Sequence, residues 1–205
     1  MKFFRNAIQP NDQSDLILMI SKLVDKFPFY TPTTPKFNKP FNMKITSAGL
    51  WGWNSDKNGY CYTRKHPYTN SNWPKIPREL INIWNKYCGK YEVPNSCLFN
   101  LYEFPNSKLG LHQDKEENDF SFPVLSLSIG STAIFKYGRT KNKLNAIKLE
   151  SGTIVIMEGA SRLAYHSITK ILKTEDNILN DEKLNSFPPH SRISITLRMY
   201  KPNSK

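Results

Sequence analysis

The chain has 205 residues, and its hydrophobic content of 39% and aromatic content of 13% are enough for a packed core, which excludes a disordered chain. That length suits one domain of ordinary size, or a core with an extension. The formal net charge of +12, from 29 lysine and arginine residues against 17 aspartate and glutamate residues, favours a polyanionic partner, either nucleic acid or an anionic membrane surface. A basic surface that serves only solvation would carry the same charge.

The cysteines Cys61, Cys88 and Cys97 are widely spaced and form no C-x-x-C pair. This pattern argues against a disulfide framework and against a cysteine-rich zinc site, and it indicates a reducing compartment. The apolar run at the N-terminus breaks too early for a signal peptide, and no window approaches 18 consecutive apolar residues. We therefore expect a cytoplasmic protein that makes no contact with a membrane.

Two helices, a proline-rich loop and a pair of strands are predicted in the first half of the chain. Residues 11–27 place apolar side chains at helical spacing, with Ser14 as the expected N-cap. Four prolines in residues 28–40 remove backbone donors that a helix or a central strand needs, so this segment is predicted to be a surface loop. Residues 43–64 are typical of two short strands with a turn at "DKNG", and residues 76–89 of a second helix.

After about residue 93 the pattern changes to short alternating segments that are rich in β-branched and aromatic residues and separated by Gly, Pro, Asn and Ser. Many short strands at this spacing predict an antiparallel sandwich or barrel, so the fold class is mainly β with flanking helices (α+β). The division predicted from this change is an N-terminal extension over residues 1–92, packed on a core over residues 93–201. Neither a G-x-G-x-x-G motif nor a P-loop is present, so a Rossmann or nucleotide-triphosphate fold has no support.

A histidine and a carboxylate, His112 and Asp114, stand two residues apart before one of these strands. Alternate side chains of an extended segment share one face, so both groups can reach one metal ion. Two histidines and one carboxylate, with positions left open, are the ligands of non-haem Fe(II) oxygenases. The third ligand is open among His66, His190 and His166; we prefer His166, because it follows a predicted strand that can direct it inward.

The last predicted strand, "RISITLRM", places Arg192 and Arg198 on one face, with hydroxyl side chains between them and apolar residues on the other face. Guanidinium groups grip carboxylates in a fork geometry, so the two arginines can converge on an elongated dianion. In "NLYEF", Asn100 and Tyr102 share a face and can orient the same ligand. The alternative for this strand is the solvent-facing side of a sheet edge, where Arg, Ser and Thr are ordinary.

Taken together, the N-x-Y, H-x-D-K, S-R-L-x-Y-H and R-x5-R motifs, in this order, resemble the AlkB family of Fe(II)- and 2-oxoglutarate-dependent dioxygenases, which remove alkyl groups from nucleic-acid bases. The resemblance covers about residues 93–201 closely and extends more loosely upstream. It implies a double-stranded β-helix (jelly roll) core, whose N-terminal helix and strand extension forms a nucleotide-recognition lid. It also implies Fe(II) with 2-oxoglutarate and O2 as cosubstrates. The implied metal ligands are His112, Asp114 and His166, and the implied 2-oxoglutarate ligands are Asn100, Tyr102, Arg192 and Arg198.

The same resemblance implies a set of substrate contacts. Trp53 matches a tryptophan that stacks on the damaged base, and Glu116 matches an acidic residue that selects the base, although Glu is one methylene longer than the expected Asp. A base must leave its stack to reach such an iron, and Trp53 with His112 would hold it between them. The remaining expected contacts to nucleic acid are Tyr60, Tyr62, Lys108 and Gln113.

The sequence thus predicts oxidative dealkylation of bases of the 1-methyladenine and 3-methylcytosine type in DNA, and in RNA as a further substrate, with formaldehyde released. Single-stranded DNA is the expected partner, and the protein is expected to act as a monomer. An alternative is a 2-oxoglutarate-dependent hydroxylase of a protein side chain or a small metabolite. A second alternative is a basic binding module without enzymatic activity, although it leaves Arg192 and Arg198 unexplained.

Overall fold

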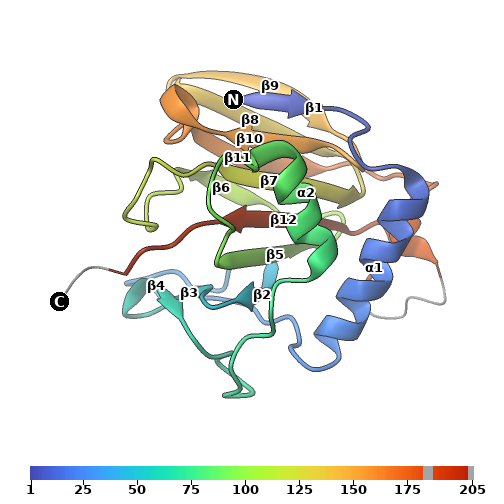
Figure 1. Cartoon of the computed structure of the whole chain (residues 1–205). Helices are drawn as coiled ribbons and strands as arrows, with labels where there is room; N and C mark the ends of the chain where they lie inside the picture. Colours follow the sequence, from blue (N-terminus) through green and yellow to red (C-terminus); the bar gives the residue numbers. More distant parts are fainter. Residues whose placement is uncertain (182–186, 203–205) are drawn as a thin grey trace.

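The structure is a computed structural model that describes residues 1–181 and 187–202. Within these residues, the larger of two main antiparallel sheets has six strands (Figure 1). Their order across the sheet is β1 (Lys2–Phe4), β10 (Ile154–Met157), β7 (Val124–Gly130), β12 (Arg192–Arg198), β5 (Ser96–Tyr102) and β2 (Lys44–Gly49). Neighbours in this order lie far apart in the chain, which is the mark of a wound β fold rather than of a meander.

A second sheet of the described chain has four strands, in the order β6 (Leu109–His112), β11 (Tyr165–Ile171), β8 (Ala133–Thr140) and β9 (Lys143–Leu149). It lies over one face of the six-stranded sheet, and apolar side chains of both sheets, such as Leu98, Phe135 and Ile168, meet between them. The predicted jelly-roll core with flanking helices is confirmed. The site described below lies between the two sheets.

Two helices, α1 (Pro10–Val24) and α2 (Arg78–Cys88), cover the outer face of the six-stranded sheet (Figure 1). Ile17 and Ile20 of α1 and Trp84 of α2 are fully buried, in one apolar cluster with side chains of β5, β7 and β12. Ser14 is not the N-cap, because Pro10 occupies the first helical turn and Gln9 precedes it; the Ser14 hydroxyl instead donates to the Pro10 carbonyl at 3.2 Å.

Residues 43–64 form three strands rather than the two that were predicted: β2, which joins the large sheet, and the hairpin of β3 (Gly52–Asp56) and β4 (Gly59–Thr63). The turn of the hairpin is the predicted one: the Asn58 amide donates to the Asp56 carboxylate at 2.7 Å, and Gly59 has a φ of +134°. The proline-rich loop before β2 lies against this hairpin, because Thr33 and Ser55 exchange hydrogen bonds.

The predicted division at residue 92 stays a prediction. Strands β1 and β2 come from the first part, yet they pair with β10 and β5 of the second part in one sheet. The polar segment between β11 and β12 contains a short 3-10 helix, Ile178–Asn180, and a second one, Gly159–Ser161, precedes β11. Among the described residues, no helix is long and apolar enough to span a membrane.

Candidate active site

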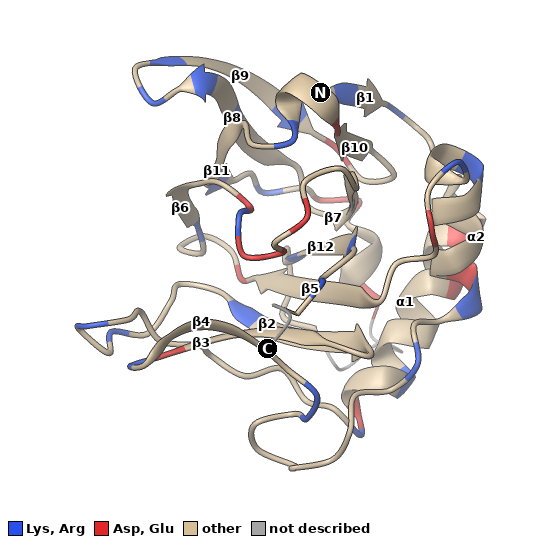
Figure 2. Ribbon diagram, turned by 60° about the vertical axis from the view of Figure 1, so that its left-hand side comes forward, with Lys and Arg blue, Asp and Glu red and all other residues tan. Residues whose placement is uncertain are grey.

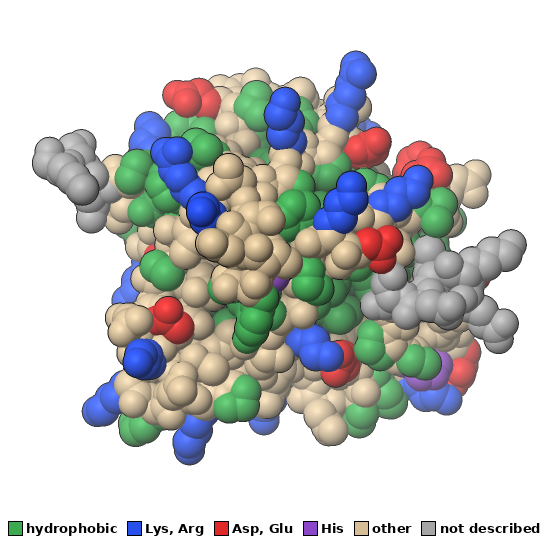
Figure 3. Space-filling model, turned by 90° about the horizontal axis from the view of Figure 1, so that it is seen from below, with side chains coloured by type: hydrophobic (Ala, Val, Ile, Leu, Met, Phe, Trp, Pro, Cys, Tyr) green, Lys and Arg blue, Asp and Glu red, His purple; other side chains and the backbone are tan. Residues whose placement is uncertain are grey.

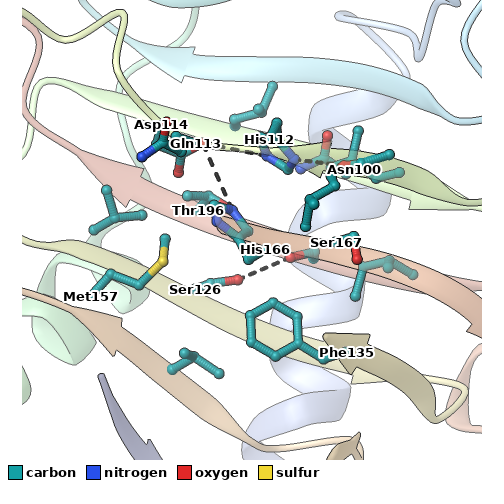
Figure 4. A pocket seen from close by; sticks show the side chains of 18 of the residues that line it. Asn100, His112, Gln113, Asp114, Ser126, Phe135, Met157, His166, Ser167 and Thr196 are labelled. Atoms are coloured by element: carbon teal, nitrogen blue, oxygen red, sulfur yellow. Dashed lines mark hydrogen bonds and ion pairs between the residues drawn. The ribbon is translucent and has the colours of Figure 1, made fainter. Parts of the chain in front are cut away.

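Three of the predicted residues meet at one end of the cavity between the sheets. His112 ends β6, His166 lies in β11, and Asp114 follows β6 by two residues. One ligand atom from each of them lies within 4.8 Å of the others, and Figure 4 shows the three side chains pointing toward one another. Asp114 Oδ1 is 3.5 Å from His112 Nε2 and 3.9 Å from His166 Nε2.

Backbone carbonyls fix which ring nitrogen of each histidine faces this centre. His112 Nδ1 lies 2.8 Å from the Gly110 carbonyl, and His166 Nδ1 lies 3.0 Å from the Ala164 carbonyl. A carbonyl only accepts, so each Nδ1 carries its proton and each Nε2 is left free to bind a metal. Burial lowers the pKa of His166 to about 4, so this ring is neutral near pH 7, as a metal ligand must be.

Asp114 is buried and ionised. Burial acts to raise its pKa, but the charge of Arg198 and the hydrogen bond with His112 outweigh burial and hold the pKa well below the ordinary value. Arg198 Nη2 lies 3.5 Å from Asp114 Oδ2, so the other oxygen, Oδ1, is the one that faces the histidines. An imidazole pair with one carboxylate oxygen fits Fe(II), and three protein ligands leave coordination positions open.

The cavity has a volume of about 450 Å³ and reaches from this triad into the space between the sheets. All four predicted cosubstrate ligands line it. The register explains why: Arg192 pairs with Tyr102, and Ser194 pairs with Asn100, so alternate residues of β12 and β5 face the cavity together. The strand "RISITLRM" is central in its sheet, so the alternative of a solvent-facing edge strand is wrong.

Arg192 is 1% exposed and has no ion pair with a carboxylate in the described part of the chain. Its Nη1 donates to the carbonyls of Ser131 and Leu149, its Nη2 donates to Ser128 Oγ, and its Nε has no hydrogen-bond partner. Burial lowers its pKa to about 10. A buried guanidinium without an acidic partner is costly, so the site fits an anionic ligand such as a carboxylate of 2-oxoglutarate.

Trp53, the predicted stacking residue, and Tyr60, a predicted contact to nucleic acid, lie together at the cavity. The rings of Trp53 and Tyr60, on β3 and β4, are nearly parallel, at 22° and 5.8 Å between centroids, and both line the cavity. Tyr60 is 50% exposed. Trp51 does not line the cavity and packs instead on Tyr200, at 5.2 Å between ring centroids, and on Arg64.

The other predicted substrate contacts divide into three cases. Glu116 and Gln113 line the cavity, and the Gln113 amide donates to the Leu163 carbonyl at 2.6 Å. Lys108 is exposed and does not line the cavity, although the next residue, Leu109, does. Tyr62 is 8% exposed and faces the interior below the hairpin, so its position does not support the predicted contact with nucleic acid.

The two other candidates for the third ligand lie elsewhere. His66 is fully buried among Tyr30, Tyr68 and Trp73; its Nδ1 accepts from two backbone amides, and its Nε2 lies 2.9 Å from the Pro28 carbonyl. His190 packs on Phe104. Both nitrogens of His66 are therefore engaged in holding its loop.

Sequence reasoning missed one buried residue of the site. Glu117 is 0% exposed and contacts Arg198, Arg162 and Tyr62. Arg162, in turn, donates to the backbone carbonyl of Asp114 at 2.7 Å, so it holds the loop that carries this ligand. The sequence does contain a signal for Glu117: two acidic residues, Glu116 and Glu117, follow H-x-D-K directly, but only Glu116 was predicted to have a role.

A jelly roll whose cavity is lined by two histidines, an aspartate and a buried arginine that pairs with no carboxylate of the described residues is the site of a non-haem iron oxygenase that uses a 2-oxo acid. The comparisons with known proteins agree. The model of the 2OG-Fe(II) oxygenase superfamily matches residues 1–198. The chain belongs to this superfamily and, within it, to the AlkB family; it is an Fe(II)/2-oxoglutarate-dependent dioxygenase.

Three similar proteins show the extent of the match. The alpha-ketoglutarate-dependent dioxygenase AlkB homolog of Caulobacter vibrioides is 37% identical over 164 residues, which are 79% of this chain and 70% of that protein. The DNA N(6)-methyladenine demethylase ALKBH1C of Arabidopsis thaliana is 30% identical over 227 aligned residues, covering 98% of this chain and 48% of the relative. The solved structure of OsALKBH1 superposes with a TM-score of 0.75, at 29% identity, over 97% of this chain and 96% of that one. The alternative of a basic binding module without enzymatic activity is therefore wrong.

Proposed function

We propose that the protein removes alkyl groups oxidatively from nucleobases of the 1-methyladenine and 3-methylcytosine type. The observation that carries this proposal is the stacked pair of Trp53 and Tyr60 over a cavity whose floor is the metal triad. Aromatic faces at the entrance of an oxidising site suit a flat, conjugated ring that has been turned out of its helix. ALKBH1C, one of the similar proteins, is a DNA N(6)-methyladenine demethylase and so acts in the same class of reaction.

The residues of this chain can bind and orient such a base. Trp53 and Tyr60 provide the stacking surface on one side, and the half-buried ring of His112 lines the cavity on the other. Glu116 lines the same cavity, and burial, aided by the charge of Glu117, raises the pKa of its carboxyl group. A carboxylate accepts hydrogen bonds and does not donate, so it favours a base edge with an exocyclic amine.

When bound, Fe(II) and 2-oxoglutarate supply the oxidation: 2-oxoglutarate and O2 become succinate and CO2, and one oxygen atom enters a C–H bond of the alkyl group, whose hemiaminal then collapses to formaldehyde and the repaired base. His112, Asp114 and His166 would hold the metal. Arg192 would hold one carboxylate of the cosubstrate in the buried part of the cavity, with Asn100 and Tyr102 beside it. The protein's own contribution is position, together with the exclusion of water from the buried end.

Charge supports a polyanionic substrate only in part. Lysine and arginine positions are spread over the ribbon (Figure 2). Two lysines line the cavity: Lys115, and Lys141 in the turn between β8 and β9. On the face that Figure 3 shows, however, lysine and arginine side chains are scattered among other residues and do not form one patch. Lys141 is therefore the basic residue that we propose contacts a phosphate, because it borders the site.

The finer assignments are also proposals: DNA as the main substrate and RNA as a second one, a preference for single strands, a monomer, and a cytoplasmic location. The cavity opening supports single strands, because a base in a flexible strand reaches it without the cost of opening a duplex. The free cysteines Cys61, Cys88 and Cys97 support a reducing compartment.

Turnover of defined oligonucleotides tests the proposal. Oligonucleotides of one sequence would carry a single 1-methyladenine or 3-methylcytosine, as single-stranded DNA, duplex DNA or RNA. Mass spectrometry would follow loss of the methyl group, and parallel assays would follow formaldehyde and succinate. We expect one formaldehyde and one succinate per repaired base, only with Fe(II), and fastest on single-stranded DNA.

The result that overturns the substrate class is absence of repair on every oligonucleotide while Fe(II) and 2-oxoglutarate are bound. Succinate formed at the same slow rate with and without oligonucleotide would point instead to the alternative, a hydroxylase of a protein side chain or a small metabolite.

A further inference from the structure

Glu117 is a fully buried carboxylate that no step above uses. Three segments contact it: Arg198 Nη1 of β12 at 2.7 Å, Arg162 Nη2 at 3.0 Å from the segment before β11, and the Tyr62 hydroxyl of β4 at 2.6 Å. A buried carboxylate is tolerated only when it is paired and hydrogen-bonded, and this one has all three partners in place. Its contacts therefore determine where those partners lie.

The contact with Arg198 bears on the metal ligand. Arg198 Nη1 is held by Glu117 and lies 3.3 Å from the Tyr62 hydroxyl, while Nη2 faces Asp114 Oδ2 at 3.5 Å. Because Glu117 holds one end of the guanidinium, Arg198 meets only one oxygen of Asp114. The other oxygen remains directed at the two histidines.

The charges of the cluster support the same role. Two carboxylates, Asp114 and Glu117, face two guanidinium groups, Arg162 and Arg198, and all four side chains are buried. If Glu117 lost its charge, Arg162 would lose its carboxylate partner, and among the ion pairs of the described residues Arg198 would keep only the one with Asp114. Asp114 would then share its charge between Arg198 and a divalent cation, so metal binding would weaken.

The third contact reaches the hairpin that carries the stacking residues. Tyr62 lies on β4, two residues after Tyr60, and its partner in the register with β3 is Trp53. The Tyr62 ring stacks on Tyr200 at 4.1 Å and 19°, which directs its hydroxyl toward Glu117. Through Tyr62, the β3–β4 hairpin is thus hydrogen-bonded to the same carboxylate that holds Arg198.

We infer that Glu117 is a positioning residue that couples the metal site to the nucleotide-recognition hairpin. Through Arg198 it keeps one oxygen of Asp114 directed at the metal, and through Tyr62 it fixes the hairpin over the cavity. The metal side of this inference needs only the oxygenase identity. That the hairpin recognises a nucleotide rests on the proposed function. The measurement of its coupling to the metal site does not.

The first experiment measures Mn(II) binding by calorimetry, since Mn(II) takes the same ligands without oxygen chemistry. Loss of a residue that supports a metal ligand usually weakens metal binding by about 10- to 100-fold. Because Glu117 acts on Asp114 through Arg198, we expect a loss of this size in Mn(II) affinity for Glu117→Gln. The matched control is Glu158→Gln. Glu158 also accepts from a tyrosine, Tyr91, and pairs with two lysines, Lys2 and Lys90, but it does not line the cavity. Mn(II) affinity in Glu158→Gln should equal that of the wild type.

The second experiment measures hydrogen exchange of residues 52–63, with and without Mn(II) and 2-oxoglutarate. In the wild type, binding should slow exchange in the hairpin, because both ends of the cluster are then fixed. Tyr62→Phe keeps the ring and all charges and removes only the hydroxyl. We expect it to abolish this gain in protection while leaving Mn(II) affinity within about twofold of wild type.

The inference is overturned if folded Glu117→Gln binds Mn(II) as the wild type does, since a merely structural role would change only thermal stability. It is equally overturned if Tyr62→Phe retains the full gain of protection, or if the wild type shows none. Should Glu117→Gln not fold, the Tyr62→Phe exchange result decides alone. No arm uses nucleic acid, so failure of the substrate proposal leaves the outcome readable.

Discussion

His112 and His166 are direct partners across the β6–β11 pair, with ring centroids 4.2 Å apart. The register shifts between His166 and Ile168, where β6 has one residue more than β11. One backbone pairing therefore brings together two proposed metal ligands that are distant in the chain. Asp114 joins them because it lies two residues beyond the end of β6.

The first prediction concerns the metal. His166→Ala should abolish the rise in melting temperature that Mn(II) produces in the wild type, because one of three ligands is lost. At a hundredfold excess over the dissociation constant, that rise corresponds to about 2.7 kcal/mol of stabilisation. Differential scanning calorimetry measures it. His190→Asn is the matched control, because His190 has a φ of +55°, a left-handed conformation that asparagine tolerates, and it does not line the cavity. An unchanged Mn(II) effect in His166→Ala would contradict the assigned triad.

The second prediction concerns the cosubstrate. Arg192→Lys keeps the charge but loses the planar fork, so 2-oxoglutarate should bind Mn(II)-loaded protein about 10- to 100-fold more weakly, for a loss of about 1.5–3 kcal/mol. Mn(II) binding itself should stay the same, because Arg192 contacts none of the three metal ligands. Titration calorimetry separates the two affinities. Equal binding of 2-oxoglutarate to both proteins would place the dianion elsewhere.

The third prediction concerns stacking. Trp53→Ala should weaken binding of methylated single-stranded DNA by about 1–3 kcal/mol, the usual contribution of one stacked base. Trp51→Ala removes the same type of side chain from the same segment, but Trp51 packs on Tyr200 and Arg64 outside the cavity. Fluorescence anisotropy with a labelled oligonucleotide compares the two. A loss of affinity in Trp51→Ala as large as that in Trp53→Ala would show that the hairpin's integrity, and not stacking, is being measured.

The fourth prediction concerns base selection by Glu116. An amide can donate a hydrogen bond as well as accept one, whereas a carboxylate only accepts. Glu116→Gln should therefore reduce the preference for 1-methyladenine, with its exocyclic amine, over 1-methylguanine, with a carbonyl at that edge, by about tenfold, or 1.4 kcal/mol. The ratio of the two kcat/KM values is the readout. An unchanged ratio would mean that Glu116 does not read this edge of the base.

The fifth prediction concerns stability and pH. The hydrogen bond from Lys2, aided by Tyr91 and opposed by partial burial, lowers the pKa of Glu158 below its ordinary value of 4.5. A carboxyl group with a depressed pKa stabilises the fold above the ordinary pKa, and this stabilisation is lost as the pH falls through the depressed value. Glu158→Gln should therefore cost about 1 kcal/mol at neutral pH and nothing in strong acid. Urea unfolding of both proteins, at neutral pH and in strong acid, measures the difference in free energy of unfolding. A difference that is the same at both pH values would mean that the substitution acts through packing and not through charge.

Several parts of this protein follow from local pattern. The alternation in "RISITLRM" predicts which face of β12 is apolar, and the structure buries Ile193, Ile195 and Leu197 against the helices. The second helix, predicted over residues 76–89, forms over Arg78–Cys88, with Pro77 directly before it and Gly89 directly after it. Ser14 was wrong as a cap because a proline four residues earlier begins the helix there, and proline at a first turn competes with any later capping signal.

Other parts could not be derived from the pattern. Trp53, Tyr60 and Tyr62 are all aromatic residues of one hairpin, yet two line the cavity and Tyr62 bonds to Glu117 beneath it. All three side chains share one face of the hairpin, because Tyr62 pairs with Trp53 and Tyr60 lies two residues before it; Tyr62 differs because Tyr200, from the far end of the chain, packs against its ring. The role of Glu117 was invisible for the same reason, since its partners come from three separate segments.

The sequence by itself determined the chemistry of this protein: the ligand types, their order along the chain and the alternation that puts two arginines on one strand face. These depend on residue identity and on short-range periodicity, which a sequence carries directly. Only the tertiary structure decided which oxygen of Asp114 faces the two histidines and which aromatic residues of the hairpin line the cavity. Those outcomes depend on strand register and on packing between distant segments, because a shift of one residue in a strand moves a side chain to the other face.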